Sequence, residues 1–305
     1  MSDSAMFLAA RRTLLIGTVM ALASAALYGA NVPAARMASQ AGLPGADLIA
    51  WRAVLFLPAL ACLAMVAGQR LRLLPGEIAP TLRLALTASL TATFYLSSVD
   101  HLPVPMAVVL FYMFPLFVIL LASRIEGRRI SRVQMGVFAV AFAGLVIAVG
   151  PSLAGLSSYG MLLALGAAIA SAFMFIYAGR VPDAPFRNAF WTQAVMGPVA
   201  FLFAWMQGGP AHPAIFWAAP IAIAVAMGAY AIAYLFQLMA AQRISADRAG
   251  LLFLFEPVTA IAAAGFVLRE TLSPLQIAGV MLILVALAAE ILLGTRESFS
   301  GRPGE

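Results

Sequence analysis

The chain has 305 residues, of which 64% are hydrophobic and 10% are charged, and its mean hydropathy is +1.00. A water-soluble fold of this size cannot bury so much apolar surface, whereas a bilayer accepts apolar side chains on the outside of every helix. Composition therefore excludes a soluble globular protein and indicates an integral membrane protein. The net charge of +6 comes from arginines, most of them in short loops between apolar runs. We therefore expect these arginines to orient the protein in the membrane, and we expect no nucleic-acid partner.

Apolar runs of about 20 residues, the length that crosses the hydrocarbon of a bilayer, recur along the chain. Breaks at glycine, proline and charged clusters separate ten of them, which predicts an all-α integral membrane protein with ten transmembrane helices. The first run continues past a signal-peptide length without a clear cleavage site, so we expect a retained helix. The predicted spans are residues 13–38, 46–67, 79–98, 104–123, 134–150, 157–178, 187–206, 214–240, 247–268 and 274–294.

Arginines fall mainly on one side of such a chain. With the N-terminus inside, 15 of the 18 lie on the cytoplasmic side, while Arg36 and Arg269 lie near the opposite face and Arg52 lies within a span. The positive-inside rule therefore predicts cytoplasmic termini in the inner (plasma) membrane. An even number of spans returns the chain to the same side, so the charge pattern agrees with the count of ten.

An internal repeat relates the two halves, because residues 91–134 align with residues 233–276 at a constant offset. Five helices per half is an odd number, so the second half enters the membrane from the other side. This is an inverted repeat, as in many secondary transporters. We predict a first repeat over 1–150 and a second, with a short cytoplasmic tail, over 151–305. Apolar matches such as Phe111 with Phe253 are common in so apolar a chain. The pairs that carry most of the weight are Pro115 with Pro257, Ser131 with Ser273 and Gln134 with Gln276.

Four stretches resemble a known family: LLIGTVMALASAALYGANVPAAR (14–36), Trp51-Arg52, FPLF (114–117) and LFEPVTAIAAAGFVLRETLSPLQIAG (254–279). They are similar to the EamA-type branch of the drug/metabolite transporter superfamily and, within it, to YddG-type amino-acid exporters. The resemblance covers residues 13–293. It implies a ten-helix carrier with a central cavity between its halves that exports small metabolites, often amino acids. One departure is Arg269, where the family commonly has glycine.

Glu256 is an acid inside the apolar run FLFEPVTAIA, nine residues into its span. At about 1.5 Å per residue, it lies near the middle of the membrane. A carboxylate at that depth is costly and faces a protein or aqueous interior. Two interpretations stay open: contact with a substrate amine or a coupling proton, or a structural bond to a neighbouring helix. The equivalent position in the first half is Phe114, so either role belongs to one half only.

Arg52 is the other charge embedded in a span. Its planar guanidinium suits a carboxylate, so it can pair with Glu256 or with the carboxylate of a substrate. The alternatives are a structural pair and a side chain that extends to the outer headgroups.

Pro115 and Pro257 each remove a helical hydrogen bond and predict a kink. Kinks at equivalent places in inverted halves predict hinges for gating, with a fixed bend as the alternative.

Polar and aromatic residues on shared helical faces complete the candidate substrate site. The alternative for each of them is interhelical packing or interfacial anchoring. These candidates are Tyr28, Asn31, Tyr95, Tyr112, Trp191, Tyr230, Tyr234 and Gln237.

Motifs for other chemistry are missing from the sequence. The two histidines, His101 and His212, lie in separate loops without a cluster of ligands, and no phosphate-binding loop is present. We therefore expect no metal, no cofactor and no catalytic residue.

A secondary transporter that exports amino acids (aromatic or other neutral) or related small metabolites by alternating access accounts for these features. Its partners would be a small-molecule substrate and the lipid bilayer, with monomer or homodimer left open. A non-transporting receptor or scaffold is the main alternative, and a membrane-embedded enzyme is a weaker one. Proton coupling and facilitated diffusion both fit the sequence.

Overall fold

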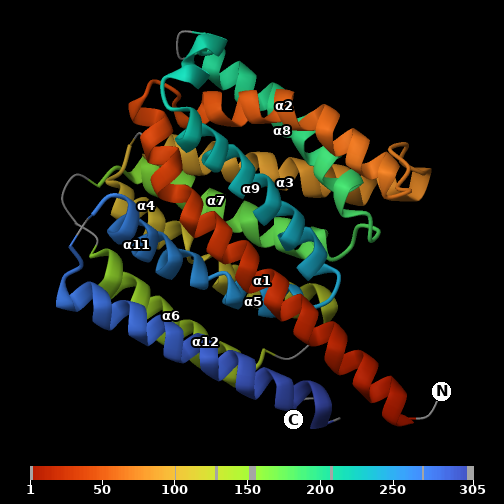
Figure 1. Cartoon of the computed structure of the whole chain (residues 1–305). Helices are drawn as coiled ribbons and strands as arrows, with labels where there is room; N and C mark the ends of the chain where they lie inside the picture. The colour runs from red at the N-terminus through yellow and green to blue at the C-terminus, as the bar shows by residue number, and fades with distance from the viewer. Residues whose placement is uncertain are drawn as a thin grey trace.

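The computed structural model describes residues 3–99, 101–127, 130–150, 156–206, 209–269 and 271–300. This part of the chain contains helices and no strand, because within a bilayer a helix satisfies every backbone N–H and C=O in its own segment. Figure 1 shows the helices in order: α1 (Asp3–Gln40), α2 (Gly45–Val66), α3 (Pro75–Val99), α4 (Val104–Phe111), α5 (Phe114–Glu126), α6 (Arg132–Val149), α7 (Ser158–Ala178), α8 (Pro185–Met206), η1 (Pro213–Trp217), α9 (Pro220–Ala241), α10 (Ala246–Leu252), α11 (Phe255–Val267) and α12 (Pro274–Ser300).

The predicted spans correspond to these helices. Nine segments of the described residues are long and apolar enough to cross a membrane. Two of these segments each consist of two consecutive short helices, α4 with α5 in one and α10 with α11 in the other. The tenth, α3, is more polar because it contains several serines and threonines, yet its 25 residues suffice to cross and it packs against α7 and α8. The eighth span begins later than predicted, since 213–217 form the short helix η1.

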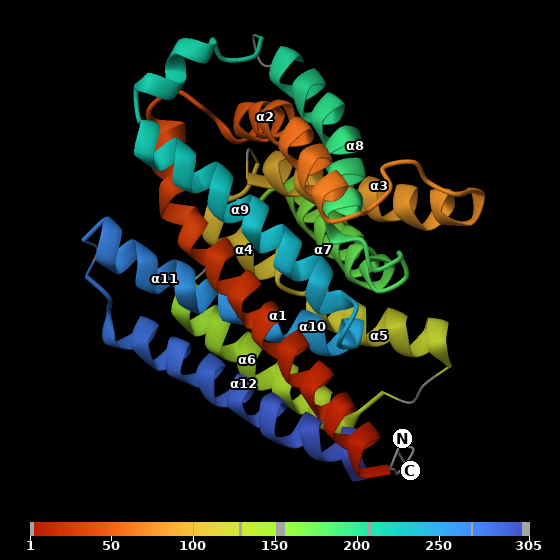
Figure 2. The ribbon, with the colours of Figure 1, turned by 45° about the vertical axis from the view of Figure 1, so that its right-hand side comes forward.

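Helix packing reproduces the inverted repeat. Helix α1 of the first half packs against α9 and α11 of the second half. Its counterpart α7, in the second half, packs against α3, α4 and α5 of the first half. The remaining helices pair with their own counterparts, α2 with α8 and α6 with α12. Figures 1 and 2 show these two pairs on opposite flanks of a central group. Two inverted five-helix repeats produce this arrangement.

The repeated serine and glutamine residues are helix caps. Ser131 Oγ accepts a hydrogen bond from Gln134 N at 3.4 Å, where α6 begins. Ser273 Oγ accepts from Gln276 N at 3.2 Å, and Ser273 N donates to Gln276 Oε1 at 2.9 Å, where α12 begins. Each cap satisfies backbone N–H groups that a helix start leaves free. The serine and glutamine matches between the two halves thus mark equivalent helix starts.

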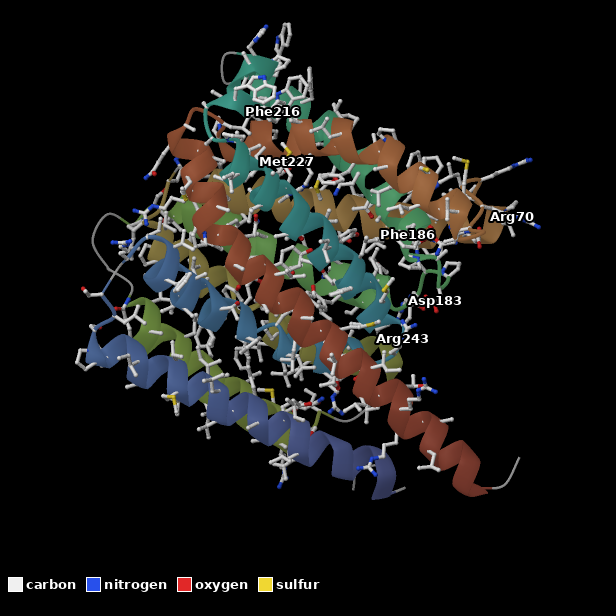
Figure 3. All side chains as sticks on the ribbon, viewed as in Figure 1. Arg70, Asp183, Phe186, Phe216, Met227 and Arg243 are labelled. Carbon is white, nitrogen blue, oxygen red and sulfur yellow. The ribbon has the colours of Figure 1, made fainter. Side chains whose placement is uncertain are left out.

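The two ends of the chain lie at the same face of the bundle (Figure 1). We call the face where α1 begins and α12 ends the terminal face, and the other the opposite face. Figure 3 shows Asp183 and Arg243 at the terminal face, where they form an ion pair at 4.0 Å, and Phe216 and Met227 towards the opposite face.

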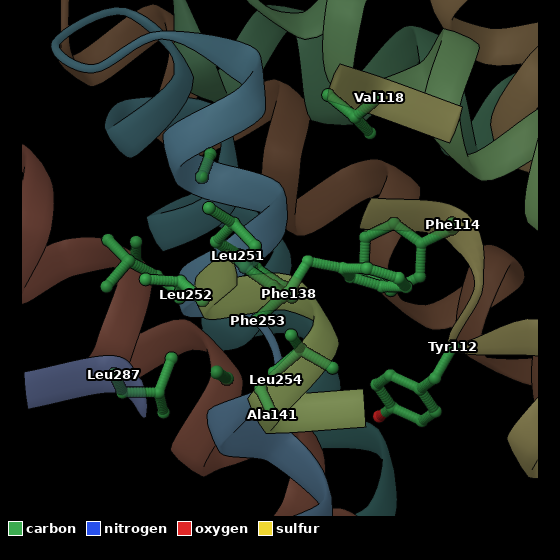
Figure 4. Packing of buried hydrophobic residues seen from close by; sticks show 14 of the residues in the cluster. Tyr112, Phe114, Val118, Phe138, Ala141, Leu251, Leu252, Phe253, Leu254 and Leu287 are labelled. Atoms are coloured by element: carbon green, nitrogen blue, oxygen red, sulfur yellow. The ribbon is translucent and has the colours of Figure 1, made fainter. Parts of the chain in front are cut away.

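The largest buried cluster connects the two interrupted spans. The rings of Phe114 and Phe175 stack at 5.2 Å, and Phe175 meets Phe253 edge to face at 4.8 Å. Figure 4 shows Phe114 and Phe253 in this cluster together with buried leucines. Because Phe114 and Phe253 lie at the two interruptions, close packing fixes one interruption relative to the other.

Candidate functional site

Both repeated prolines follow an interruption of their helix. Between α4 and α5 only residues 112–113 leave the helix, and between α10 and α11 only 253–254 do. Pro115 is in the first turn of α5 and Pro257 in the first turn of α11, where a missing N–H costs no hydrogen bond. The predicted bends are therefore present at equivalent positions, and each creates a new helix start within the membrane.

Glu256 lies in the first turn of α11. A helix start carries partial positive charge, so this position stabilises a carboxylate that would otherwise be costly in a membrane. Helix α1 approaches closely here: a Cβ atom at Gly29 would collide with the Thr259 side chain and the Glu256 backbone. The interruption before Pro257 thus explains how an apolar span accommodates Glu256.

Three tyrosines lie near the Glu256 carboxylate. Tyr28 from α1, Tyr95 from α3 and Tyr112 from the first interruption each interact with it electrostatically, and the Tyr112 hydroxyl is within hydrogen-bonding reach. Tyr95 also packs on Phe111 at 4.9 Å between ring centroids. Glu256, in the second half of the chain, therefore has three tyrosine neighbours from the first half.

Arg52 lies under the aromatic ring of Tyr230. Its guanidinium carbon is 3.3 Å from the ring centroid, and Nη2 donates to the sulfur of Met196 at 3.7 Å. The residue is only 2% exposed, so its side chain does not extend to the headgroups. No ion pair joins it to Glu256 in the described part of the chain, and its buried Nε has no hydrogen-bond partner there.

Helix α9 connects the acid and the base. The Tyr28 hydroxyl donates to Gln237 Oε1 at 3.0 Å, and the Tyr28 ring meets the Tyr230 ring edge to face at 5.2 Å. Tyr230 stacks on Tyr234 at 6.4 Å, and the Tyr234 hydroxyl donates to Thr192 Oγ1 at 2.9 Å. Tyr28 thus contacts Tyr230, whose ring covers Arg52, and also interacts with Glu256.

The structure brings together eight of the ten predicted substrate-binding residues. We call this group the central aromatic site. Asn31 lies one turn beyond Tyr28 on α1, and its buried Oδ1 has no hydrogen-bond partner among the described residues. Trp191 lies elsewhere, near the terminal face. The central aromatic site comprises Tyr28, Arg52, Tyr95, Tyr112, Tyr230, Tyr234, Gln237 and Glu256.

Trp191 belongs to a pair of symmetry-related ties. Its indole N–H donates to the carbonyl of Leu71, just before α3, at 2.8 Å. Trp51 on α2 donates to the carbonyl of Ala211, just before η1 and α9, at 2.9 Å. The sequence separation between the two tryptophans equals that between the two residues whose carbonyls accept. Each half therefore fastens its second helix to the loop that precedes the third helix of the other half.

An ion pair strengthens the tie on the terminal face. Arg187 Nη1 lies 3.1 Å from Glu77 Oε2, and Arg187 N donates to Gln69 Oε1 at 3.1 Å. Glu77, in the first turn of α3, also accepts a hydrogen bond from the backbone N–H of Leu74 at 2.9 Å. Asp47 corresponds to Arg187 when Trp51 is aligned with Trp191. Among the described residues it accepts a single hydrogen bond, from the backbone N–H of Ala211 at 3.3 Å. The terminal face thus has the stronger tie.

A buried polar cluster near the terminal face was missed by sequence reasoning. Gln134 Nε2 donates to Asp247 Oδ2 at 2.7 Å, and Arg248 interacts electrostatically with Glu290 on α12. Asp247, Arg248 and Glu290 are 5%, 4% and 2% exposed. The sequence presents residues 242–248 as a polar turn, and no local pattern shows that a distant helix covers them. This cluster holds α10 against α6 and α12.

A cavity of about 320 Å³ opens between the ends of α1, α2, α3 and α8 at the opposite face. Met196 lines it and also contacts Arg52, so Met196 separates the cavity from the central aromatic site. Within the described ranges, no group of three or more His, Cys, Asp or Glu residues is placed to hold a metal ion.

Comparisons with known proteins agree with this architecture. A family model described as the EamA-like transporter family matches residues 15–150 and, a second time, residues 158–290. No curated protein matches, but 28 chains of solved structures do. One of these, described only as "Crystal structure of protein", has a TM-score of 0.73 and 18% identity over 94% of this chain and 98% of its own, which shows the fold alone. The chain belongs to the EamA-like transporter family, and is thus a multi-pass membrane transporter of the drug/metabolite transporter superfamily.

Proposed function

We propose that this transporter exports amino acids, aromatic or other neutral ones, or related small metabolites across the inner membrane by alternating access. The observation that carries the proposal is the central aromatic site, in which a buried base and an acid flank a group of tyrosines. A neutral amino acid carries one carboxylate and one ammonium group. Arg52 suits the carboxylate, Glu256 suits the ammonium, and the tyrosine faces suit an apolar or aromatic side chain.

The direction of transport rests on the arginines. In this proposal the terminal face is cytoplasmic, because most arginine-bearing loops and both termini belong to it. Export then carries the substrate from the terminal face to the opposite face.

Alternating access requires helices with two arrangements, and the interrupted spans supply them. Pro115 and Pro257 are the proposed hinges, since the helical hydrogen bonds are already interrupted beside them. Of the two interrupted spans, we propose that the one made of α10 and α11 is the more mobile, and that α11 is the part that moves. Helix α10 is buried almost throughout, whereas α11 has only Pro257 and Val258 buried among its 13 residues.

Exchange in proteoliposomes tests the function. Purified protein is reconstituted with unlabelled phenylalanine inside, and entry of labelled phenylalanine or leucine is followed. We expect saturable exchange, which Arg52→Gln and Glu256→Gln each lower at least tenfold, because each substitution leaves a substrate charge unpaired (about 2–5 kcal/mol). If folded wild-type protein exchanges none of the neutral amino acids tested, the proposal fails.

The same vesicles distinguish the two roles of Glu256. If the carboxylate carries a coupling proton, an imposed pH gradient changes the wild-type rate and leaves the residual rate of Glu256→Gln unchanged. If it only binds the ammonium group, neither rate follows the gradient.

A further inference from the structure

Arg52 has binding capacity that its present neighbours do not fill. A guanidinium has five N–H donors, and a thioether such as Met196 is a weak acceptor. The Tyr230 ring covers one face of the guanidinium, and the buried Nε has no hydrogen-bond partner among the described residues. Both neighbours can yield to a carboxylate, because a charge-assisted pair is stronger than a contact with sulfur or with a ring.

The cavity at the opposite face lies on the other side of Met196. Ser39, Thr93 and Ser97 line it, together with apolar residues that include Leu96 and Phe203. Its 320 Å³ falls within the range of small-molecule sites, roughly 300–1,000 Å³. The described residues that line it include no Asp or Glu, in contrast to the central aromatic site with Glu256.

We propose that this cavity is a second binding site, for monocarboxylates with an apolar body, and that Met196 admits their carboxylate to Arg52. Methionine suits this role because its unbranched side chain changes rotamer easily. The apolar body packs on the Leu96 and Phe203 wall, and no ammonium group is needed because the described lining offers it no acid. The proposal stands whether or not the central aromatic site carries amino acids.

Binding of 3-phenylpropionate to the purified full-length protein tests this site by titration calorimetry. 3-Phenylpropionamide, which has the same body without the charge, is the ligand control. We expect the carboxylate to bind and the amide not to. Arg52→Gln weakens binding about 30-fold or more, because it removes the charged partner. Thr93→Phe abolishes binding by filling the cavity, and Met196→Ala strengthens it several-fold by opening the path to Arg52.

The matched protein control is Glu256→Gln, which alters the central aromatic site and leaves the cavity intact. Unchanged affinity in Glu256→Gln supports the second site. Equal losses in Glu256→Gln and Arg52→Gln would overturn it, because the probe would then occupy the central aromatic site. Unchanged affinity in Thr93→Phe, or equal binding of the amide, would also overturn it. Melting curves confirm that each variant is folded. Thr93→Phe keeps Arg52 in place, so it tests the cavity even if Arg52→Gln fails to fold.

Discussion

Helices α10 and α11 are two parts of one membrane span, yet they are packed very differently. Six of the seven residues of α10 are buried, against two of the 13 residues of α11. Helix α10 is surrounded by α1, α5, α6, α7, α9 and α12, whereas α11 packs mainly against α1 (Figure 2). The interruption at residues 253–254 therefore separates a fixed segment from a lightly packed one. Glu256 lies at the start of the lightly packed segment.

In a bilayer the apolar residues of α11 that the protein leaves uncovered can face lipid at little cost. A change in the packing of α11 therefore exposes no apolar surface to water. The same change in α10 would separate the buried charges of Asp247, Arg248 and Glu290, which is expensive.

The two glutamates of these regions test this difference most strongly. Glu290→Gln removes a buried charge that interacts with Arg248, so we expect it to lower the free energy of unfolding by about 3 kcal/mol. Glu256→Gln changes the half-buried carboxylate at the start of α11, so we expect a stability loss below about 1 kcal/mol together with a large loss of exchange. Thermal unfolding in detergent measures both changes. Equal stability losses in the two variants would contradict the difference between α10 and α11.

Gly29 tests the contact between α1 and α11. In Gly29→Ala the new methyl group collides with Thr259 and with the Glu256 backbone, so we expect a loss of about 1–3 kcal/mol and slower exchange. Gly228→Ala is the matched control, because a Cβ there meets nothing within 4 Å. In a helix interior such a change stabilises by up to about 1 kcal/mol. Similar melting temperatures for both variants would show that α1 does not fix the start of α11.

The tryptophan ties sharpen the comparison between the two faces. Trp191→Phe and Trp51→Phe each remove one hydrogen bond to a loop carbonyl, which costs about 1 kcal/mol. We expect the smaller loss of exchange in Trp191→Phe, because the Arg187–Glu77 pair still holds its loop. Melting curves and exchange rates of the two variants check this order, and the reverse order would contradict it.

Arg269 lies beyond the end of α11 and gives the smallest expected effect. Its φ of 56° is in the left-handed region, which costs an arginine about 1–2 kcal/mol and a glycine much less. Glycine loses more chain entropy on folding, so Arg269→Gly should stabilise the protein by at most about 1 kcal/mol. A lower melting temperature in this variant would show that the arginine side chain makes a compensating contact.

Local patterns were enough to predict most of the fold. Hydropathy locates the ten spans, and Pro115 and Pro257 mark the two interruptions because the effect of proline on a helix is local. Proteins of the family that the sequence resembles commonly have glycine where this chain has Arg269. The backbone at Arg269 adopts a left-handed conformation, which favours glycine.

The site was less predictable, because burial depends on distant segments. Helical faces were enough to propose Tyr28, Tyr95 and Gln237, which do gather around Glu256 and Arg52. They were not enough for Trp191, whose partner is a loop carbonyl 120 residues away. Nothing near Arg248 or Glu290 in the chain shows that helix packing brings the two together.

Spin-label distances test the central claim, that α11 moves about residues 253–254 while α10 stays fixed. Cys62, the single cysteine, is first replaced by serine. Pairs of labels then join Tyr159 on α7 either to Phe266 near the end of α11 or to Ser245 just before α10, all in nanodiscs with and without phenylalanine. The account predicts a substrate-dependent change in the distance to 266 and none in the distance to 245. An unchanged distance to 266, or equal changes in both, would contradict it.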